Sequence, residues 1–308
     1  MAAVLNSNVA SLWASKNLQG AQNKMADSVE RLSSGLRINR ASDDAAGLGI
    51  ANALTQQING ANQGVRNLND GISMVQTAEG AIAAAQEMAQ RIVTLATQGS
   101  NGTLGSSERN AIRSEMRQLL TAIDSIGTRT KFSSNSLLNN GTASGTSITL
   151  QVTNNSSDVI TLNESAFRRI GVGASAASGT VVGGAKDFVT ASDATAGLAA
   201  ALANKVNDIA GDETQANQLL VLGLAKTYIE NLSTQRSLLG AYQNQIEFTV
   251  NNTTELASNL SAARSSVQDT DYASETAALT KGQILQQAAT AMLAQANQMP
   301  NVILSLLK

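Results

Sequence analysis

Apolar residues recur at alternating steps of three and four over residues 51–95, and this spacing limits the fold more than any other feature of the sequence. The first run consists of Ala51, Leu54, Ile58, Ala61, Val65, Leu68, Ile72 and Val75. After a slip near Ala78, the run resumes with Ile82, Ala85, Ala89, Ile92 and Leu95. A helix with this repeat has one apolar stripe and needs a partner helix. The pattern predicts a helix of about fifty residues, roughly 75 Å long, far beyond the average helix of about a dozen.

A second heptad row occupies residues 225–267. Its members are Ala225, Leu232, Leu239, Ile246, Thr253, Leu260 and Val267. A companion row contains Tyr228, Tyr242, Leu256 and Ala263, and positions 235 and 249 in that row are polar. Two long stripes separated by a different kind of segment predict a mainly α fold. We expect an elongated antiparallel helical bundle, or coiled-coil rod, that brings the chain ends together.

Capping residues predict where the helices of the first half begin and end. Ser42, Asp43 and Asp44 offer an N-cap and early acidic residues, and Gly99 and Gly102 end the long helix. Ser106 or Ser107 is expected to cap a following helix that Gly127 terminates. The apolar residues of that helix expected on one face are Ile112, Met116, Leu119, Ile123 and Ile126.

The two ends of the chain predict further helices with apolar stripes. Residues 5–33 carry Leu18, Met25 and Leu32 in steps of seven. Residues 272–297 carry Ile284, Leu285, Ala288 and Met292, and Pro300 then precedes an apolar tail. Such apolar surface usually marks an interaction site. We therefore interpret these residues as an interaction stripe on the two terminal segments, residues 1–41 and 268–308.

The middle of the chain, residues 133–195, is dominated by Gly, Ser, Thr and Asn. Alternating apolar residues at 148–152 and 160–162 flank a turn at Asn154–Ser157, which predicts one β-hairpin over 147–162. Residues 166–199 are expected to be a short variable surface region, with a short strand near 181–182. Helical spacing returns over 196–210.

The composition argues against an enzyme and against most ligand sites. The chain has no His and no Cys, which removes the commonest general base and metal ligand, thiol chemistry and disulfides. The net charge of -2 argues against nucleic-acid binding. The glycine run at 171–176 is interpreted as a loop, not a dinucleotide site, and Asp43–Asp44 and Asp269–Asp271 as helix caps, not metal ligands. We expect no catalytic residues, no cofactor and no metal.

The sequence also shows no pattern typical of a secretory signal or a membrane span. Residues 1–8 lack the charged start and apolar run of a cleaved secretory signal, and no stretch reaches transmembrane length. The expected protein does not insert into membranes, and is cytoplasmic or exported without such a signal.

Several motifs near both ends resemble bacterial flagellin. At the N-terminal end they are Leu5–Asn8, Glu30–Asn39, Asp43–Gly47, Gln57–Asn59, Asn69–Ser73 and Gln76–Gly80. At the C-terminal end they are Asp269–Ala273, Gln283–Ala288, Leu293–Asn297 and Leu304–Leu307. The resemblance covers roughly residues 1–165 and 217–308, in order.

This resemblance implies a subunit that polymerises with itself into the extracellular flagellar filament for motility. Its terminal helices would form the inner layer, and residues 42–165 with 200–267 a helical rod. Export would use the flagellar type III apparatus, with an export chaperone and cap and junction proteins as partners. Contact with the vertebrate Toll-like flagellin receptor is implied at Gln90, Arg91, Leu95, Gln98 and Glu115. Val93 and Thr94 replace a familiar Arg-Glu pair, so weaker recognition is expected.

Three alternatives remain at this point. The hook–filament junction protein has similar terminal helices but usually lacks the full set of these motifs. A cytoplasmic coiled-coil adaptor would not form fibres. A flagellin with an inserted hydrolase is disfavoured, because the middle segment is short and the chain lacks His.

Overall fold

The computed structural model describes residues 8–138, 147–163, 166–167, 170, 201–206 and 215–306. The helices are α1 (Val9–Ser34), α2 (Ala45–Gly99), α3 (Ser106–Arg129), α5 (Gln215–Gln268) and α6 (Tyr272–Leu306). The strands are β1 (Lys131–Phe132), β2 (Asn135–Ser136), β3 (Ile148–Gln151) and β4 (Val159–Leu162). Residues 201–206 are also helical. The expected strand near 181–182 and the glycine run at 171–176 lie outside the described residues, as does most of the expected variable region.

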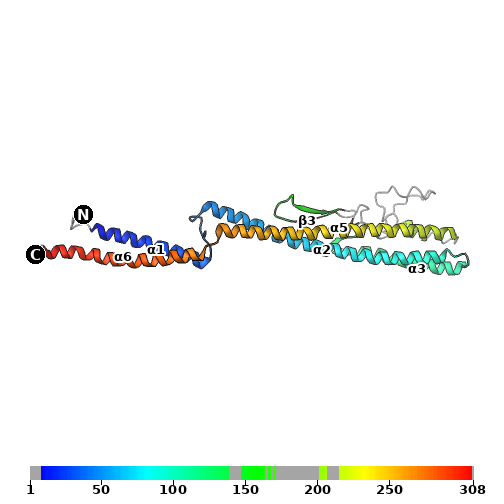
Figure 1. Cartoon of the computed structure of the whole chain (residues 1–308). Coiled ribbons are helices and arrows are strands. Elements are labelled where there is room, and N and C mark those ends of the chain that lie inside the picture. The colour runs from blue at the N-terminus through cyan, green and yellow to red at the C-terminus, as the bar shows by residue number, and fades with distance from the viewer. Residues whose placement is uncertain are drawn as a thin grey trace. The chain divides into compact units, whose positions relative to one another are not determined.

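The chain forms two compact units (Figure 1). The terminal unit contains residues Met1–Ile58 and Ala257–Lys308, and the central unit contains Asn59–Leu256. Both α2 and α5 contribute residues to each unit. The sequence-based domain boundaries near residues 41 and 268 instead coincide with breaks between helices, and that division stays a prediction.

Two very long helices dominate the central unit, which confirms the mainly α prediction. Helix α2 has 55 residues and α5 has 54. They run antiparallel, since Gln86 Nε2 donates to Ser233 Oγ at 3.3 Å and Arg236 Nη2 pairs with Glu79 Oε1 at 3.3 Å. Low helix propensity in the Asn- and Gly-rich stretches is overridden by this lengthwise packing.

The core of the central unit is built from large side chains of α2, α3, α5 and the two hairpins. Residues with no exposed surface include Leu68, Ile82, Ile92, Met116, Ile123, Leu162, Tyr228, Leu232 and Leu239. The Tyr228 hydroxyl donates to the carbonyl oxygen of Ile170 at 2.7 Å, so this buried polar group is satisfied. Burial of this kind stabilises the unit without help from another chain.

The buried stripe of α2 corrects one detail of the sequence interpretation. One row runs in unbroken steps of seven through Ala61, Leu68, Val75, Ile82, Ala89 and Ala96. Its companion runs through Gly64, Gly71, Ala78, Ala85, Ile92 and Gly99, all buried. The expected slip near Ala78 is therefore wrong. Val65 and Ile72, expected in the stripe, are half-buried, because glycines occupy the buried positions beside them.

The predicted hairpin over 147–162 is confirmed, and its contact with α2 explains two of these glycines. Strands β3 and β4 pair antiparallel, with Ile148 opposite Leu162. A β-carbon at Gly64 would lie 1.5 Å from the carbonyl oxygen of Val152, and one at Gly71 would lie 2.3 Å from Leu150 Cδ1. At Gly64, where the neighbouring atoms are backbone, only glycine lets the hairpin approach the helix this closely; at Gly71 the end of the flexible Leu150 side chain can move aside.

The segment after α2 departs from prediction in four places. Gly105 precedes α3 as a cap without a side-chain hydrogen bond, so neither Ser106 nor Ser107 caps the helix. Gly127 is buried inside α3 instead of ending it, and Leu120 is buried in place of Leu119, which is half-buried. A second hairpin, β1 with β2, was not predicted; Ser133 in its turn has a φ of 56°.

Candidate assembly surface

Helices α1 and α6 form an antiparallel pair in the terminal unit (Figure 1). At one end of the pair, Asn8 Nδ2 donates to the carbonyl oxygen of Ala296 at 2.7 Å. At the other end, the Tyr272 hydroxyl donates to the carbonyl oxygen of Leu32 at 3.2 Å. The predicted terminal helices therefore pair with each other within one chain.

The seam between α1 and α6 is lined mainly by small residues. Its buried positions are Ala14, Ala21 and Ser28 on α1, and Gly282, Ala289 and Ala296 on α6. Leu18, Met25 and Leu32 of the predicted stripe are half-buried at this seam. A β-carbon at Gly282 would lie only 3.5 Å from Met25 Cβ, so the two helices pack closely there. A seam of small side chains buries little apolar area and stabilises the pair weakly.

Several other large apolar side chains of the pair point away from the seam. Ile284, Leu285 and Met292 are 60, 46 and 63% exposed, and Ala288 is exposed with them. By contrast, Leu279, Gln286 and Leu293, which lie at other positions along α6, are half-buried. The α6 part of the predicted stripe is thus a free surface in the single chain.

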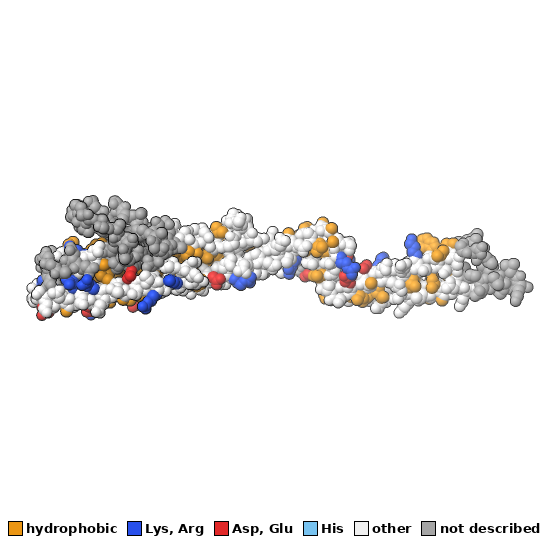
Figure 2. All heavy atoms as spheres, turned by 180° about the vertical axis from the view of Figure 1, so that it is seen from behind, with side chains coloured by type: hydrophobic (Ala, Val, Ile, Leu, Met, Phe, Trp, Pro, Cys, Tyr) orange, Lys and Arg blue, Asp and Glu red, His pale blue; other side chains and the backbone are white. Residues whose placement is uncertain are grey.

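Helix α1 adds large apolar residues that the stripe analysis missed. Val9, Leu12 and Trp13 are 52, 67 and 64% exposed. Their spacing of three and one does not fit a search for steps of seven, although three such residues within one turn could have signalled the patch. We name Val9, Leu12, Trp13, Ile284, Leu285 and Met292 the outer apolar surface. Figure 2 shows hydrophobic side chains on the exterior of these helices.

The segment that connects α1 to α2 and the segment that connects α5 to α6 lie next to this pair and are joined by backbone hydrogen bonds. Leu36 forms an antiparallel bridge with Asp269. The Arg37 amide donates to the Gln268 carbonyl at 2.7 Å, and the Thr270 amide to the Gly35 carbonyl at 3.0 Å. Gly35 ends α1 with a φ of 74°, a conformation that favours glycine. We name residues 34–44 with 268–271 the clasp.

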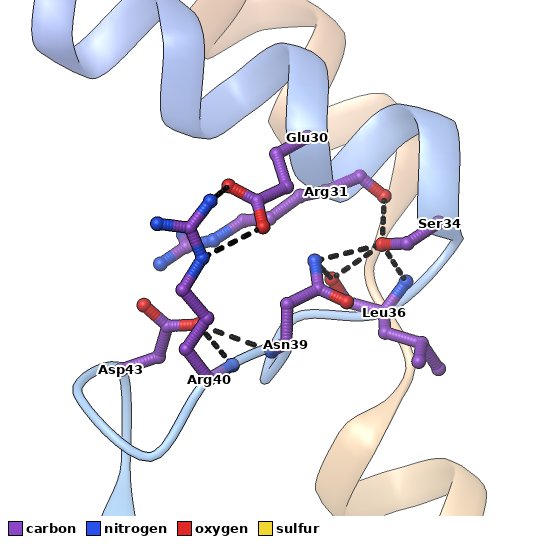
Figure 3. Close-up of polar contacts among 7 residues, drawn as sticks. All are labelled: Glu30, Arg31, Ser34, Leu36, Asn39, Arg40 and Asp43. Carbon is purple, nitrogen blue, oxygen red and sulfur yellow. Dashed lines mark hydrogen bonds and ion pairs between the residues drawn. The ribbon is translucent and has the colours of Figure 1, made fainter.

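Side chains complete the clasp (Figure 3). Arg40 pairs with Glu30 through two contacts of 3.0 and 2.6 Å. The Asp43 carboxylate accepts from the amides of Arg40 and Asn39 at 2.9 and 3.0 Å. These bonds, that from Arg40 first, lower the pKa of Asp43. Asp43 therefore caps the loop, whereas Asp44 caps α2 by accepting from the Gly47 amide at 2.8 Å.

The five residues expected at a receptor contact lie on α2 and α3 of the central unit. Arg91 donates from Nε and Nη2 to Glu115 Oε1 at 2.9 and 2.7 Å, and both side chains are exposed. Gln90 and Gln98 are also exposed. Leu95 is only 2% exposed and belongs to the core. The accessible part of this set is therefore polar.

Within the described residues, no group of three His, Cys, Asp or Glu side chains could hold a metal ion. The same residues include no helix that is long and apolar enough to cross a membrane. What stands out among the residues that the structure describes is the set of exposed apolar side chains on the helices.

Comparisons with known proteins agree on one family. Residues 5–143 match the bacterial flagellin N-terminal helical region, and residues 222–307 match the bacterial flagellin C-terminal helical region. Flagellin B of Vibrio cholerae is 36% identical, with all of both chains covered. Polar flagellin F of Vibrio parahaemolyticus is also 36% identical over all of both chains.

A solved structure described as a flagellar hook-associated protein from Vibrio parahaemolyticus shares the fold. Its TM-score is 0.56 at 13% identity, and the match covers 74% of this chain and all of that chain. An identity this low extends the likeness to the fold alone. The sequence identities to flagellins over the full length favour the flagellins over the hook-associated group.

Proposed function

Because this chain belongs to the bacterial flagellin family and is a filament subunit, we propose that its copies polymerise through the terminal helices α1 and α6. The observation that supports this proposal is the outer apolar surface. In the pair, the fully buried positions hold small residues, and six large apolar residues lie outside. Exposed apolar patches of this kind mark interaction sites, and burial against other copies would remove them from water.

The geometry of such a contact suits a fibre. Val9, Leu12 and Trp13 lie on α1, and Ile284, Leu285 and Met292 lie on α6, so one copy presents two different apolar faces. A contact between different faces of identical subunits is heterologous, and it extends into a helical filament when the rotation does not close. The stripe residues Leu18, Met25, Leu32 and Ala288 would support this surface from the seam and its edge.

The decisive experiment places a charge on the outer apolar surface. Leu285→Asp should abolish polymerisation, because a carboxylate buried between copies costs several kcal/mol if it stays ionised, and the cost recurs at every subunit. Thermal unfolding of the central unit should stay unchanged, since Leu285 lies outside it. Electron microscopy and sedimentation would measure filament formation.

A matched control uses Leu219, a 51% exposed leucine on α5 in the central unit. Leu219→Asp should still give filaments at ordinary protein concentration. Polymerisation of the Leu285→Asp variant at the wild-type concentration would disprove the role of the outer apolar surface. Failure of both variants to polymerise would mean that the effect is not specific to this surface.

Partners and location follow from the family. As a filament subunit the protein is expected outside the cell, exported through the flagellar type III apparatus. An export chaperone and the cap and junction proteins are the expected partners. A structural family gives no ground for an enzymatic role.

We also propose that the exposed polar residues Gln90, Arg91, Gln98 and Glu115 contact the Toll-like flagellin receptor of vertebrate hosts. Leu95 is buried, so it would not touch the receptor; it would instead hold this face of α2 in place by packing in the core. Arg91→Ala should reduce receptor activation by the monomer in a reporter assay. Arg66→Ala, which alters another exposed arginine of α2, is the matched control. Equal activation by both variants would refute the contact.

A further inference from the structure

The chain contains three Asn-Gly pairs, at residues 59–60, 101–102 and 140–141. An asparagine before glycine is chemically labile, because glycine has no side chain to hinder attack by its backbone nitrogen on the asparagine side chain. Whether that attack takes place depends on the local fold. The pair at 140–141 lies outside the described residues, so the comparison is between the other two pairs.

Asn101 and Gly102 lie in the turn that connects α2 to α3 at one end of the central unit (Figure 1). The Leu104 amide donates to the Asn101 carbonyl oxygen at 3.3 Å, which closes a β-turn with Gly102 and Thr103 at its centre. The amide of Gly102 takes no part in that closing hydrogen bond. Asn101, Gly102 and Thr103 are all exposed, so water reaches the turn.

The side chain of Asn101 is held over this turn. The Thr103 amide donates to Asn101 Oδ1 at 3.2 Å, an arrangement that asparagine often forms in turns. This hydrogen bond closes a small ring that includes both Asn101 Cγ and the Gly102 nitrogen, so the two atoms stay near each other. It also polarises the Cγ–Oδ1 bond and stabilises the negative charge that develops on Oδ1 during attack.

Asn59 and Gly60 have the same sequence but a different environment. They lie within α2, where each backbone amide donates to the carbonyl oxygen four residues earlier. The Gly60 nitrogen therefore has to lose a helix hydrogen bond before it can attack Asn59. A β-carbon at Gly60 would lie 2.8 Å from Asn154 Cβ, so the hairpin packs closely against this position. The fold thus protects Asn59, although its side chain is exposed.

We propose that Asn101 is a site of spontaneous deamidation. The Gly102 nitrogen loses its proton to solvent and forms a bond to Asn101 Cγ. The Cγ–Nδ2 bond breaks, and the nitrogen takes up a proton and leaves as ammonia, so that a cyclic succinimide remains. Water then opens the ring at either carbonyl and gives aspartate or isoaspartate. The net reaction consumes one water, releases one ammonia and requires no oxidant or reductant.

The reaction changes the charge of the turn. A carboxylate replaces a neutral amide, so each modified chain gains one negative charge, and isoaspartate also adds a methylene group to the main chain. The change falls where the turn is joined to α3, because Arg109 Nη2 donates to the Asn101 carbonyl oxygen at 3.2 Å. Modified chains accumulate with age. The inference is independent of the proposed polymerisation, since it requires only the fold of the central unit.

Mass spectrometry of the aged monomer tests the proposal. Purified full-length protein is kept at mildly alkaline pH, sampled over time and digested with trypsin. The peptide 92–109 contains Asn101 as its only asparagine, and fragmentation of the peptide 41–66 separates Asn59 from its neighbours. Asn101 should convert about tenfold faster than Asn59, because a helix hydrogen bond opposes the reaction only at Asn59. Equal rates, or no conversion of Asn101, would overturn the proposal.

Two controls separate the effect of the turn from that of the dipeptide. Gly102→Ala should slow the conversion of Asn101, because a methyl group hinders the attack. The variant should keep its fold, since this β-carbon would meet nothing within 4 Å. An unchanged rate would rule out attack by the Gly102 nitrogen. In urea, which removes both helix and turn, Asn59 should convert as fast as Asn101; slower conversion of Asn59 in urea would mean that the fold does not cause the difference.

Discussion

The two compact units distribute their apolar side chains in opposite ways. In the central unit, large residues such as Ile82, Tyr228 and Leu232 have no exposed surface. In the terminal unit, the fully buried positions of the α1–α6 seam hold alanine, serine and glycine, while Trp13 and Met292 are more than 60% exposed. Both units use a heptad repeat, so the repeat alone does not determine where the large side chains lie.

This difference separates stability from assembly. The central unit buries its large side chains internally and can hold its fold as a single chain. The α1–α6 pair leaves Trp13, Leu285, Met292 and other large apolar side chains outside its own seam, so contacts with other copies would add to its stability. A filament subunit benefits from this division, because premature ordering of the assembly surface in a single chain would compete with contacts between copies.

The sharpest test compares one leucine from each unit. Leu232→Ala should lower the free energy of unfolding of the central unit by about 2–5 kcal/mol, because the buried side chain leaves a cavity. Leu18→Ala should cost about 1 kcal/mol or less, because Leu18 is only half-buried at a seam of small residues. Denaturant unfolding of the monomer, followed by circular dichroism, measures both.

Limited proteolysis adds a local measure to this pair. Leu18→Ala should speed cleavage within α1 and leave α2 and α5 as resistant as in the wild type. Equal losses of stability for the two variants would mean that the terminal helices already belong to a cooperative monomer core, and the division argued here would fail.

A second test asks whether the central unit depends on the close contact between the hairpin and α2. Gly64→Ala should destabilise this unit by about 1–3 kcal/mol, because the new methyl group would collide with the Val152 carbonyl and displace the hairpin. Gly80→Ala is the matched control on the same helix, since its β-carbon would meet nothing within 4 Å. That control should gain about 0.5–1 kcal/mol from higher helix propensity. Opposite signs in thermal unfolding are the expected result, and equal signs would contradict the glycine contact.

Much of the fold could be predicted because apolar periodicity records lengthwise helix packing. The heptad repeats predicted α2 and α5, and the alternating apolar residues on both sides of Asn154–Ser157 predicted the β3–β4 hairpin. The same method failed where glycine occupies a buried position. Gly64 and Gly71 carry no apolar side chain, so the neighbouring Val65 and Ile72 were assigned to the stripe. The β1–β2 hairpin was missed because its strands are too short to show alternation.

The candidate site could be predicted in part. The sequence identified Ile284, Leu285 and Met292 as residues that need a partner, and the structure leaves them exposed. It could not separate them from Leu18, Met25 and Leu32, because steps of seven define a row without saying which row meets the neighbouring helix. Trp13 could not be predicted, because it lies outside the rows of apolar residues seven apart.

The smallest expected effect concerns the clasp beside the terminal helices. The pKa of Asp43 lies below its ordinary value of 3.8, because the carboxylate accepts from the amides of Arg40 and Asn39. Since the folded pKa is lower than the unfolded one, this contribution is complete above 3.8 and is lost as the pH falls through the folded pKa. Amide chemical shifts of Asn39 and Arg40 should therefore titrate with a midpoint below 3.8, and Asp43→Asn should remove that titration. The change should stay local, because Asp43 is exposed and the backbone bonds that join Gly35 and Arg37 to Thr270 and Gln268 do not involve its carboxylate. A midpoint at the ordinary aspartate value would mean that the carboxylate is free in solution. Loss of central-unit stability in the same pH range would mean that the clasp couples the two units, and their independence would no longer hold.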